Sequence, residues 1–225
     1  MKGKRQDPTI VEKMRREWDQ RAQENARHYV ATGKTEWSDE DFFKSGQDHV
    51  EQFILPDIKD ICARVRASEM HILEIGCGAG RMTEPLSRLF GHVDAVDISS
   101  EMVARARTAL AARENVQFHV NNGFDLSMLP DNSFDFAFSV IVFQHIPRKS
   151  VVENYIRETW RVLRSNSLFK FQLQGYPIAE RHADTWVGVG FSEADIADCA
   201  ARCGFQIKKT EGAGTQDFWI TLLKP

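Results

Sequence analysis

Three glycines about a third of the way along the chain have the spacing of a ligand-binding turn. Gly76, Gly78 and Gly80 follow a short apolar run, and Glu74 comes two residues before the first of them. Glycine lets the backbone turn sharply and leaves room for a ligand to lie against bare peptide. Asp97 comes 17 residues after Gly80, where its carboxylate could accept hydrogen bonds from both hydroxyls of a ribose and would disfavour a 2′-phosphate.

The glycine spacing also separates two kinds of nucleotide site. A dinucleotide site is built on G-x-G-x-x-G, whose third glycine allows tight helix packing behind a pyrophosphate. The run here is G-x-G-x-G. A nicotinamide-dependent dehydrogenase is therefore disfavoured, although it stays among the alternatives. A turn that serves only packing is a weaker reading, because the acidic partners would then be without a role.

The four cysteines are Cys62, Cys77, Cys199 and Cys203. They form no zinc signature, and they are too few for a disulfide framework in a chain of this length. Cys199 and Cys203 lie four apart on a predicted helix and could supply two metal ligands, but no companion Cys or His pair is near. The simpler interpretation is reduced thiols in a cytoplasmic protein with no bound metal.

Strands and helices alternate from about residue 70 onward, which favours a doubly wound, mostly parallel sheet. Phe134–Val142 is almost entirely apolar, as expected for a strand buried on both faces. One predicted helix ends near Phe90. The others span Glu101–Arg113, Ser150–Leu163 and Glu193–Arg202. The predicted strands are His71–Ile75, His92–Val96, Val116–Val120, Phe134–Val142, Leu168–Leu173, Phe205–Thr210 and Asp217–Leu223.

The first part of the chain has a helical pattern. Apolar residues recur at steps of three and four, at Ile10, Val11, Met14, Trp18 and Ala22. Ser38 followed by Asp41 is a capping-box signal, and Pro56 stands where a proline can open a helix. We expect an N-terminal helical cap over residues 1–50 and a Rossmann-like domain over residues 51–225.

Composition limits the classes of partner. The chain has 225 residues, of which 42% are hydrophobic, and a net charge of −3 without a basic stripe. Nucleic acid is thus an unexpected partner. No apolar run reaches the roughly 20 residues of a membrane helix, and the charged start, Met1–Pro8, is unlike a signal peptide.

Five segments together resemble the class I S-adenosylmethionine-dependent methyltransferases. The resemblance extends over roughly residues 50–225, with the motifs in the family's order and at familiar spacing. They are His71–Arg81, Val93–Ser99, Leu129–Asp135, Phe143–Pro147 and Arg161–Arg164.

The resemblance implies a seven-stranded sheet whose last strand is antiparallel, with S-adenosylmethionine as cofactor and S-adenosylhomocysteine as product. It implies that the glycine loop holds the methionyl end, that Asp97 holds the ribose, and that Asn122–Asp125 lies along the adenine. Val140 and Gln144 should lie near the sulfonium. The full set of expected cofactor-binding residues is Tyr29, Glu74, Gly76, Cys77, Gly78, Gly80, Arg81, Asp97, Ile98, Met102, Asn122, Gly123, Phe124, Asp125, Val140 and Gln144.

Two departures from the family pattern stand out. Ser165, Asn166 and Ser167 replace the usual proline-glycine-glycine turn, at a place expected to be far from the cofactor. The segment around Asn122 is one residue longer than the commonest pattern. Asp135 belongs to a family motif, but a structural role at the start of a strand is the favoured reading.

His145 is the candidate catalytic residue, because the resemblance puts it where a methyl acceptor would lie. It could be a general base or a packed residue, and the sequence leaves both open. We expect methyl transfer to an oxygen or nitrogen of a small molecule, without a metal. A protein methyltransferase and a non-catalytic cofactor-binding subunit are the alternatives, and the oligomeric state is not indicated.

Tyr29 and Trp37 lie in a stretch, Arg27–Ser38, without a clear helical period. In this family such a segment often covers the cofactor as a lid. A packed layer that only stabilises the domain is the competing hypothesis for both aromatics.

Overall fold

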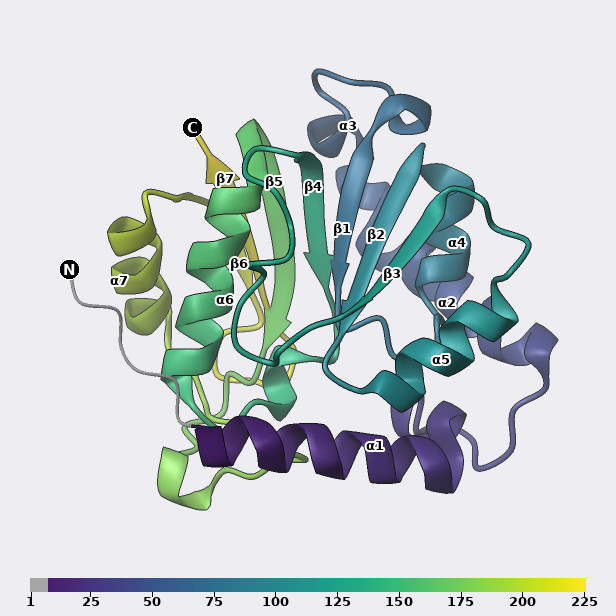
Figure 1. The fold of residues 1–225 in the computed structure, drawn as a ribbon. Coiled ribbons are helices and arrows are strands. Elements are labelled where there is room, and N and C mark those ends of the chain that lie inside the picture. Colours follow the sequence, from purple (N-terminus) through teal and green to yellow (C-terminus); the bar gives the residue numbers. More distant parts are fainter. Residues whose placement is uncertain (1–7) are drawn as a thin grey trace. The chain divides into compact units, whose positions relative to one another are not determined.

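The computed structural model describes residues 8–225, so nearly all of the charged start of the chain lies outside the described residues. The chain forms two compact units. One comprises the residues up to Met14 together with Asn122–Pro225, and the other comprises Arg15–Asn121. Figure 1 shows the fold. Among residues 8–225, none of the helices has both the length and the apolar character needed to cross a bilayer.

Seven strands form the sheet in the order β3-β2-β1-β4-β5-β7-β6. In the unit Arg15–Asn121, β1 (His71–Ile75), β2 (His92–Asp97) and β3 (Val116–Val120) pair in parallel. In the other unit, β4 (Phe134–Ser139) and β5 (Leu163–Leu173) are parallel, whereas β7 (Phe218–Lys224) runs antiparallel to both β5 and β6 (Gln206–Glu211). The predicted Rossmann-like sheet with its antiparallel last strand is confirmed.

Two helices of the unit Arg15–Asn121 start at a serine whose side chain caps the first turn. Ser38 accepts a hydrogen bond from the Asp41 amide at the start of α2, and Ser99 does the same for the Met102 amide at the start of α5. The helices are most of α1 (Pro8–Val30), α2 (Asp39–Phe53), η1 (Leu55–Asp57), α3 (Ile58–Ile61), η2 (Ala67–Glu69), α4 (Thr83–Leu89) and α5 (Ser100–Ala109).

The unit containing Asn122–Pro225 has a core rich in phenylalanine. Ser192 and Asp195 form a reciprocal capping box at the start of α7, and Gly204 ends that helix in the left-handed conformation. The helices are η3 (Phe143–His145), α6 (Lys149–Val162), η4 (Glu180–His182) and α7 (Glu193–Cys203). Seven phenylalanines of this unit are less than 2% exposed, namely Phe134, Phe136, Phe138, Phe143, Phe169, Phe171 and Phe218.

Several predicted boundaries differ from the structure. The strand predicted to reach Val142 ends at Ser139, because Ile141 has a left-handed φ of 57° and leaves the ladder. Helix α5 stops at Ala109 rather than Arg113, and β5 begins at Leu163 rather than Leu168. Helix α2 continues past residue 50 to Phe53, so the expected boundary between cap and domain falls inside a helix and stays a prediction.

Candidate functional site

The glycine loop has the strained geometry that only glycine accepts easily. Gly76, Gly78 and Gly80 have φ values of 80°, 52° and 86°, in the left-handed region that side chains disfavour. The Gly76 and Cys77 amides donate to the Val96 carbonyl at 2.7 and 3.0 Å. These bonds continue the pairing of β1 with β2 into the loop and fix where the turn begins.

Asp97 ties the loop to the start of α5. Its Oδ2 accepts a hydrogen bond from the Gly78 amide at 2.8 Å, and its Oδ1 accepts one from the Ser99 amide at 2.9 Å. Burial raises the pKa of Asp97 to about 6, although hydrogen bonds from the backbone, including those of Ser99 and Gly78, oppose the rise. An ionised carboxylate has about four acceptor positions, so these two bonds leave capacity for ribose hydroxyls.

Glu74 and Arg81 have partners inside the protein. The Thr83 hydroxyl donates to Glu74 Oε2 at 2.6 Å, and burial raises the pKa of Glu74 to about 7. The buried Arg81 guanidinium donates to the Ser45 carbonyl at 3.1 Å and lies 3.1 Å from the His49 ring nitrogen. Arg81 therefore anchors α2 against the loop, a role that the family motif did not indicate.

His49 accepts that contact in its neutral form. Burial and the adjacent Arg81 charge lower the pKa of His49 to about 4. The ring nitrogen that faces the guanidinium is therefore unprotonated and accepts through its lone pair. Gly46 lies on the same helix, and a Cβ added there would come 2.0 Å from the Arg81 carbonyl oxygen. The close approach of α2 to the end of the glycine loop thus requires glycine at this position.

The end of α1 rests on the glycine loop. A Cβ added to Gly78 would lie 2.7 Å from Val30 Cγ2, so Val30 occupies the space that bare peptide leaves. The Tyr29 hydroxyl donates to Glu24 at 3.0 Å, and Trp37 Nε1 donates to the Ala31 carbonyl at 2.9 Å. Helix α1 extends to Val30, with an interruption at Asn25, although the sequence showed no clear period from Arg27 onward.

The remaining expected residues of this unit have mixed surroundings. Cys77 and Met102 are buried, and Ile98 is half-buried. Met102 belongs to a buried apolar cluster with Ala22, Ala26, Phe42 and Ala79. Five partly buried residues pack against this cluster, namely Trp18, Val30, Ala31, Trp37 and Phe43. All four cysteines are free thiols.

In the other unit, Asn122–Asp125 forms a tight turn organised by its first residue. Asn122 Oδ1 accepts from the Phe124 and Asp125 amides, both at 2.9 Å, and Asn122 Nδ2 donates to Asp125 Oδ1 at 2.8 Å. Gly123 has a φ of 77°. Burial alone would raise the pKa of Asp125, but hydrogen bonds from Ser127 and Asn122 outweigh it and lower that pKa. The Asp125 carboxylate is therefore a part of the turn.

The segment after β4 holds His145 in a defined tautomer. His145 Nδ1 lies 2.6 Å from the Trp186 carbonyl oxygen, and because a carbonyl only accepts, Nδ1 carries the proton. Nε2 then has the lone pair, with Gln144 Nε2 at 3.4 Å. His145 is buried, with 8% of its surface exposed. Nε2 is therefore the basic nitrogen of this tautomer.

Gln144 is buried as well, and its side-chain oxygen has no hydrogen-bond partner among the described residues. Its backbone is held by the Gly188 amide, which donates to the Gln144 carbonyl at 2.7 Å. A Cβ on Gly188 would come 2.5 Å from that carbonyl oxygen, so this pairing requires glycine. Val140, the other residue expected near the sulfonium, is half-buried.

Sequence reasoning missed the strained residue between them. Ile141 is β-branched and has a φ of 57°, a rare combination that persists only where its surroundings fix it. The Ile141 amide donates to Gln172 Oε1 at 3.0 Å, and Gln172 Nε2 donates to Asp217 at 2.6 Å. No short sequence pattern marks this arrangement, because its parts come from the segment after β4, from β5 and from the residue before β7.

Comparison with known proteins identifies a methyltransferase domain in the chain. Residues 73–171 match a family described as a methyltransferase domain. A ubiquinone biosynthesis O-methyltransferase from Xanthomonas oryzae is 30% identical over 121 residues, which are 53% of this chain and 49% of that protein. The chain thus spans about half the length of this curated relative.

Solved structures share the fold. Magnesium protoporphyrin IX methyltransferase from Synechocystis, solved with bound S-adenosylmethionine, covers 100% of both chains with a TM-score of 0.66 and 19% identity. The complex of DhpI with S-adenosylhomocysteine covers 96% of this chain and 97% of DhpI, with a TM-score of 0.65 and 19% identity. Residues 73–171 thus carry a methyltransferase domain, and the chain has the fold of S-adenosylmethionine-dependent methyltransferases, in agreement with the predicted enzyme class and cofactor.

Proposed function

We propose that this chain transfers the methyl group of S-adenosylmethionine to an oxygen or nitrogen of a small-molecule acceptor, with His145 as the general base. The observation that carries the proposal is the 2.6 Å contact between His145 Nδ1 and the Trp186 carbonyl. It puts the ring proton on Nδ1, so Nε2, which lies 3.4 Å from Gln144 Nε2, is the nitrogen that would take the acceptor proton. Histidine also titrates close to neutral pH, as a base for this task must.

The chemistry needs little beyond alignment and proton removal. Methyl transfer from a sulfonium is an in-line displacement, so the protein must hold the acceptor, the methyl carbon and the sulfur in line and exclude water. As the acceptor oxygen or nitrogen bonds the methyl carbon, the carbon–sulfur bond breaks and the acceptor proton passes to His145 Nε2. The sulfur leaves as the neutral thioether of S-adenosylhomocysteine.

We propose cofactor contacts for each of the two units separately. In Arg15–Asn121, the glycine loop would hold the methionyl end and Asp97 the ribose hydroxyls. In the unit that contains Asn122–Pro225, the turn Asn122–Asp125 would lie along the adenine, most directly through backbone groups, since its carboxylate is already engaged. The unpartnered Gln144 oxygen is a buried acceptor that a bound ligand would satisfy.

The relatives favour an oxygen acceptor within this proposal. The curated relatives are named as O-methyltransferases of ubiquinone biosynthesis, which suggests a hydroxyl on a small molecule. The balanced charge of −3 is unlike that of a protein that binds nucleic acid. We place the protein in the cytoplasm because its four cysteines are free thiols.

Transfer of a labelled methyl group tests this function. The full chain would be incubated with methyl-labelled S-adenosylmethionine and separate panels of hydroxyl-bearing metabolites, amine-bearing metabolites and peptides. We expect label in the first panel. Label only in peptides would favour the protein methyltransferase. Cofactor binding without transfer in any panel would favour the non-catalytic subunit, and tight NAD binding without a response to S-adenosylhomocysteine would refute the cofactor assignment.

We also propose that the N-terminal helices act as a lid, since Val30 lies against Gly78. Asn25 interrupts α1 with an extended backbone, at a φ of −163°, which gives the last turn of the helix a place to pivot. Removal of residues 1–37 should leave a folded domain with weak cofactor binding and almost no turnover. Proteolysis near Gly33 should slow when S-adenosylhomocysteine is added. Normal turnover after truncation would identify a purely structural layer.

A further inference from the structure

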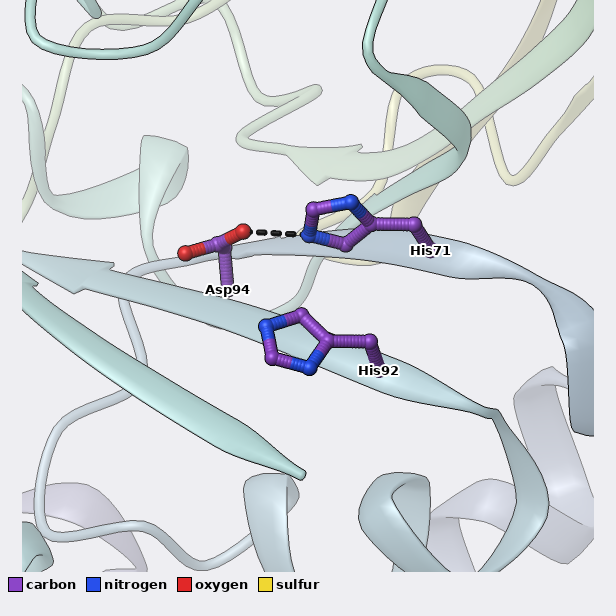
Figure 2. Close-up of side chains that lie close together, drawn as sticks. All are labelled: His71, His92 and Asp94. Atoms are coloured by element: carbon purple, nitrogen blue, oxygen red, sulfur yellow. Dashed lines mark hydrogen bonds and ion pairs between the residues drawn. The ribbon is translucent and has the colours of Figure 1, made fainter. Parts of the chain in front are cut away.

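A second group of chemically active side chains lies on strands β1, β2 and β3, outside the glycine loop. His71 opens β1, His92 opens β2, Asp94 follows on β2, and His119 is on β3. The register pairs His71 with His92, and Val96 with His119. Because side chains alternate along a strand and paired residues of parallel strands share a face, all four project from the same face. Figure 2 shows three of them.

Asp94 is the centre of this group. Its Oδ2 contacts His71 Nε2 and its Oδ1 contacts His119 Nε2, as the dashed line in Figure 2 marks for His71. Only 7% of the Asp94 side chain is exposed. A buried carboxylate needs a compensating positive charge or several strong hydrogen bonds. Within residues 8–225, its side-chain hydrogen-bond partners are the imidazoles of His71 and His119.

His92 is close to this carboxylate without being needed for its hydrogen bonds. Its ring meets the His71 ring edge to face, with centroids 4.6 Å apart and an interplanar angle of 83°. His71, His92 and Asp94 each offer one ligand atom, and these atoms all lie within 4.8 Å of one another. Two histidines and one buried carboxylate that converge on one volume have the chemistry of a metal centre.

We propose that His71, His92 and Asp94 bind a divalent transition-metal ion, with Zn²⁺ as the favoured ion, and that His119 holds the carboxylate from outside. Tetrahedral Zn²⁺ with bonds of about 2.1 Å needs its ligand atoms roughly 3.4 Å apart. Side-chain rotations that move the ligand atoms by about 1 Å would bring them to this spacing. The His71 side chain is 33% exposed, which gives the ion a route from solvent. Water fills the fourth position.

His119 then has the role that outer partners of metal ligands usually have. It fixes the orientation of the Asp94 carboxylate through the oxygen that does not face His71, and such partners strengthen metal binding by about 10- to 100-fold. Nitrogen ligands disfavour Mg²⁺, which prefers oxygen. The ion would join β1 to β2 and stabilise the unit Arg15–Asn121. The sequence shows no catalytic metal cluster and therefore predicts that the protein binds no metal, and this inference departs from that expectation.

Metal binding by the full chain, freed of any affinity tag and treated with a chelator, tests the inference. Calorimetry should show one Zn²⁺ per chain, no comparable Mg²⁺ binding, and a melting temperature that rises with Zn²⁺ by mass action. Co²⁺ should give the visible spectrum of a tetrahedral site without a thiolate charge-transfer band. His119→Ala should weaken Zn²⁺ binding about 10- to 100-fold, and His92→Ala should weaken it further.

His182→Ala is the matched control, since His182 is an exposed histidine on η4, and it should leave Zn²⁺ affinity unchanged. His92→Gln, a smaller change at a half-buried position, replaces His92→Ala if the alanine variant does not fold. Three results would overturn the inference. They are absence of stoichiometric Zn²⁺ binding to the wild type, undiminished binding in the folded His92 variant, and a Co²⁺ thiolate band, which would indicate the cysteines instead.

Discussion

Two turns that follow buried strands obtain their shape in opposite ways. The glycine loop after β1 is shaped by its own residues, since Gly76, Gly78 and Gly80 all take positive φ values. The turn after β4 also has a positive φ, but at Ile141, which resists it. Distant groups hold this second turn: the Gln172 side chain accepts the Ile141 amide, and the Gly188 amide donates to the Gln144 carbonyl.

The difference shows whether local residues or remote ones determine the conformation of a turn. A conformation that glycine accepts freely is recorded in a short motif, and its neighbours only complete it. A conformation that costs about 1–3 kcal/mol must be compensated by packing and hydrogen bonds from elsewhere. The glycine loop should therefore respond to changes in its own residues, whereas the turn after β4 should respond to its remote supports.

The largest expected effect concerns His145, in the remotely supported turn. His145→Gln keeps a polar side chain of similar size but removes the base, and general-base catalysis contributes typically 10²- to 10⁴-fold. We expect kcat to fall by about that factor for an oxygen acceptor while the Kd of S-adenosylhomocysteine stays the same. Steady-state kinetics and calorimetry measure the two quantities.

His182→Gln, at an exposed histidine, is the control and should leave kcat unchanged. An unchanged kcat in His145→Gln would show that His145 is a packed residue, the reading that the sequence also allowed. A loss of cofactor affinity along with kcat would mean that the substitution disturbs the turn, and the catalytic role would then lack support.

The contrast between the two turns also explains what the sequence could predict. Strand β1 and the glycine loop were located to the residue, because an apolar run followed by G-x-G-x-G is a local signal. The strand before Ile141 was predicted too long, since its apolar residues continue past the point where the backbone leaves the ladder. The buried Arg81 that anchors α2 and the convergence of His71 with Asp94 depend on tertiary packing and strand register, which no single motif contains.

A pH-dependent effect follows from Glu74, beside the locally determined loop. Burial raises the pKa of Glu74 from 4.5 to about 7. A carboxyl with a higher pKa in the folded chain binds its proton more tightly there, so this group lowers stability as pH rises from about 4.5 through 7. Glu74→Gln keeps an acceptor for Thr83 and removes the charge. Above pH 7 it should raise the free energy of unfolding, by on the order of 3 kcal/mol at most.

Urea unfolding at pH 5 and pH 8 measures this effect. The variant should show a smaller loss of stability between the two pH values than the wild type does. Part of the slope should remain, because burial also raises the pKa of Asp97, to about 6. Parallel pH profiles for Glu74→Gln and wild type would show that the Glu74 carboxyl keeps an ordinary pKa.

The next effect concerns cofactor affinity through Asp97. Asp97→Asn removes a charge and replaces one acceptor oxygen with a donor that faces the Gly78 or Ser99 amide. Hydrogen bonds to a charged group are worth roughly 1.5–3 kcal/mol, so the Kd of S-adenosylmethionine should rise at least about tenfold. Asp198→Asn, at an exposed aspartate of α7, is the control. Equal Kd values for both variants would restrict Asp97 to a structural role.

The smallest effect compares two glycines of the same unit, Gly78 and Gly33. At Gly78, alanine would have to adopt a φ of 52°, and its Cβ would lie 2.7 Å from Val30 Cγ2. The left-handed conformation alone costs about 1–2 kcal/mol for a residue with a side chain. At Gly33 nothing lies within 4 Å of an added Cβ, so alanine there should be neutral or stabilise by up to about 1 kcal/mol through the unfolded chain.

Gly78→Ala should therefore destabilise the protein by about 1–2 kcal/mol and weaken cofactor binding roughly tenfold, while Gly33→Ala leaves binding intact. Adding Val30→Ala to Gly78→Ala separates the two causes, because it removes the crowding but not the backbone strain. If the double variant recovers most of the binding, crowding against Val30 at the end of α1 causes the loss, and the loop conformation depends on that contact. If it recovers none, the loop geometry is determined by the glycines themselves. A Gly78→Ala variant that binds cofactor as well as Gly33→Ala would contradict the local origin of the loop geometry.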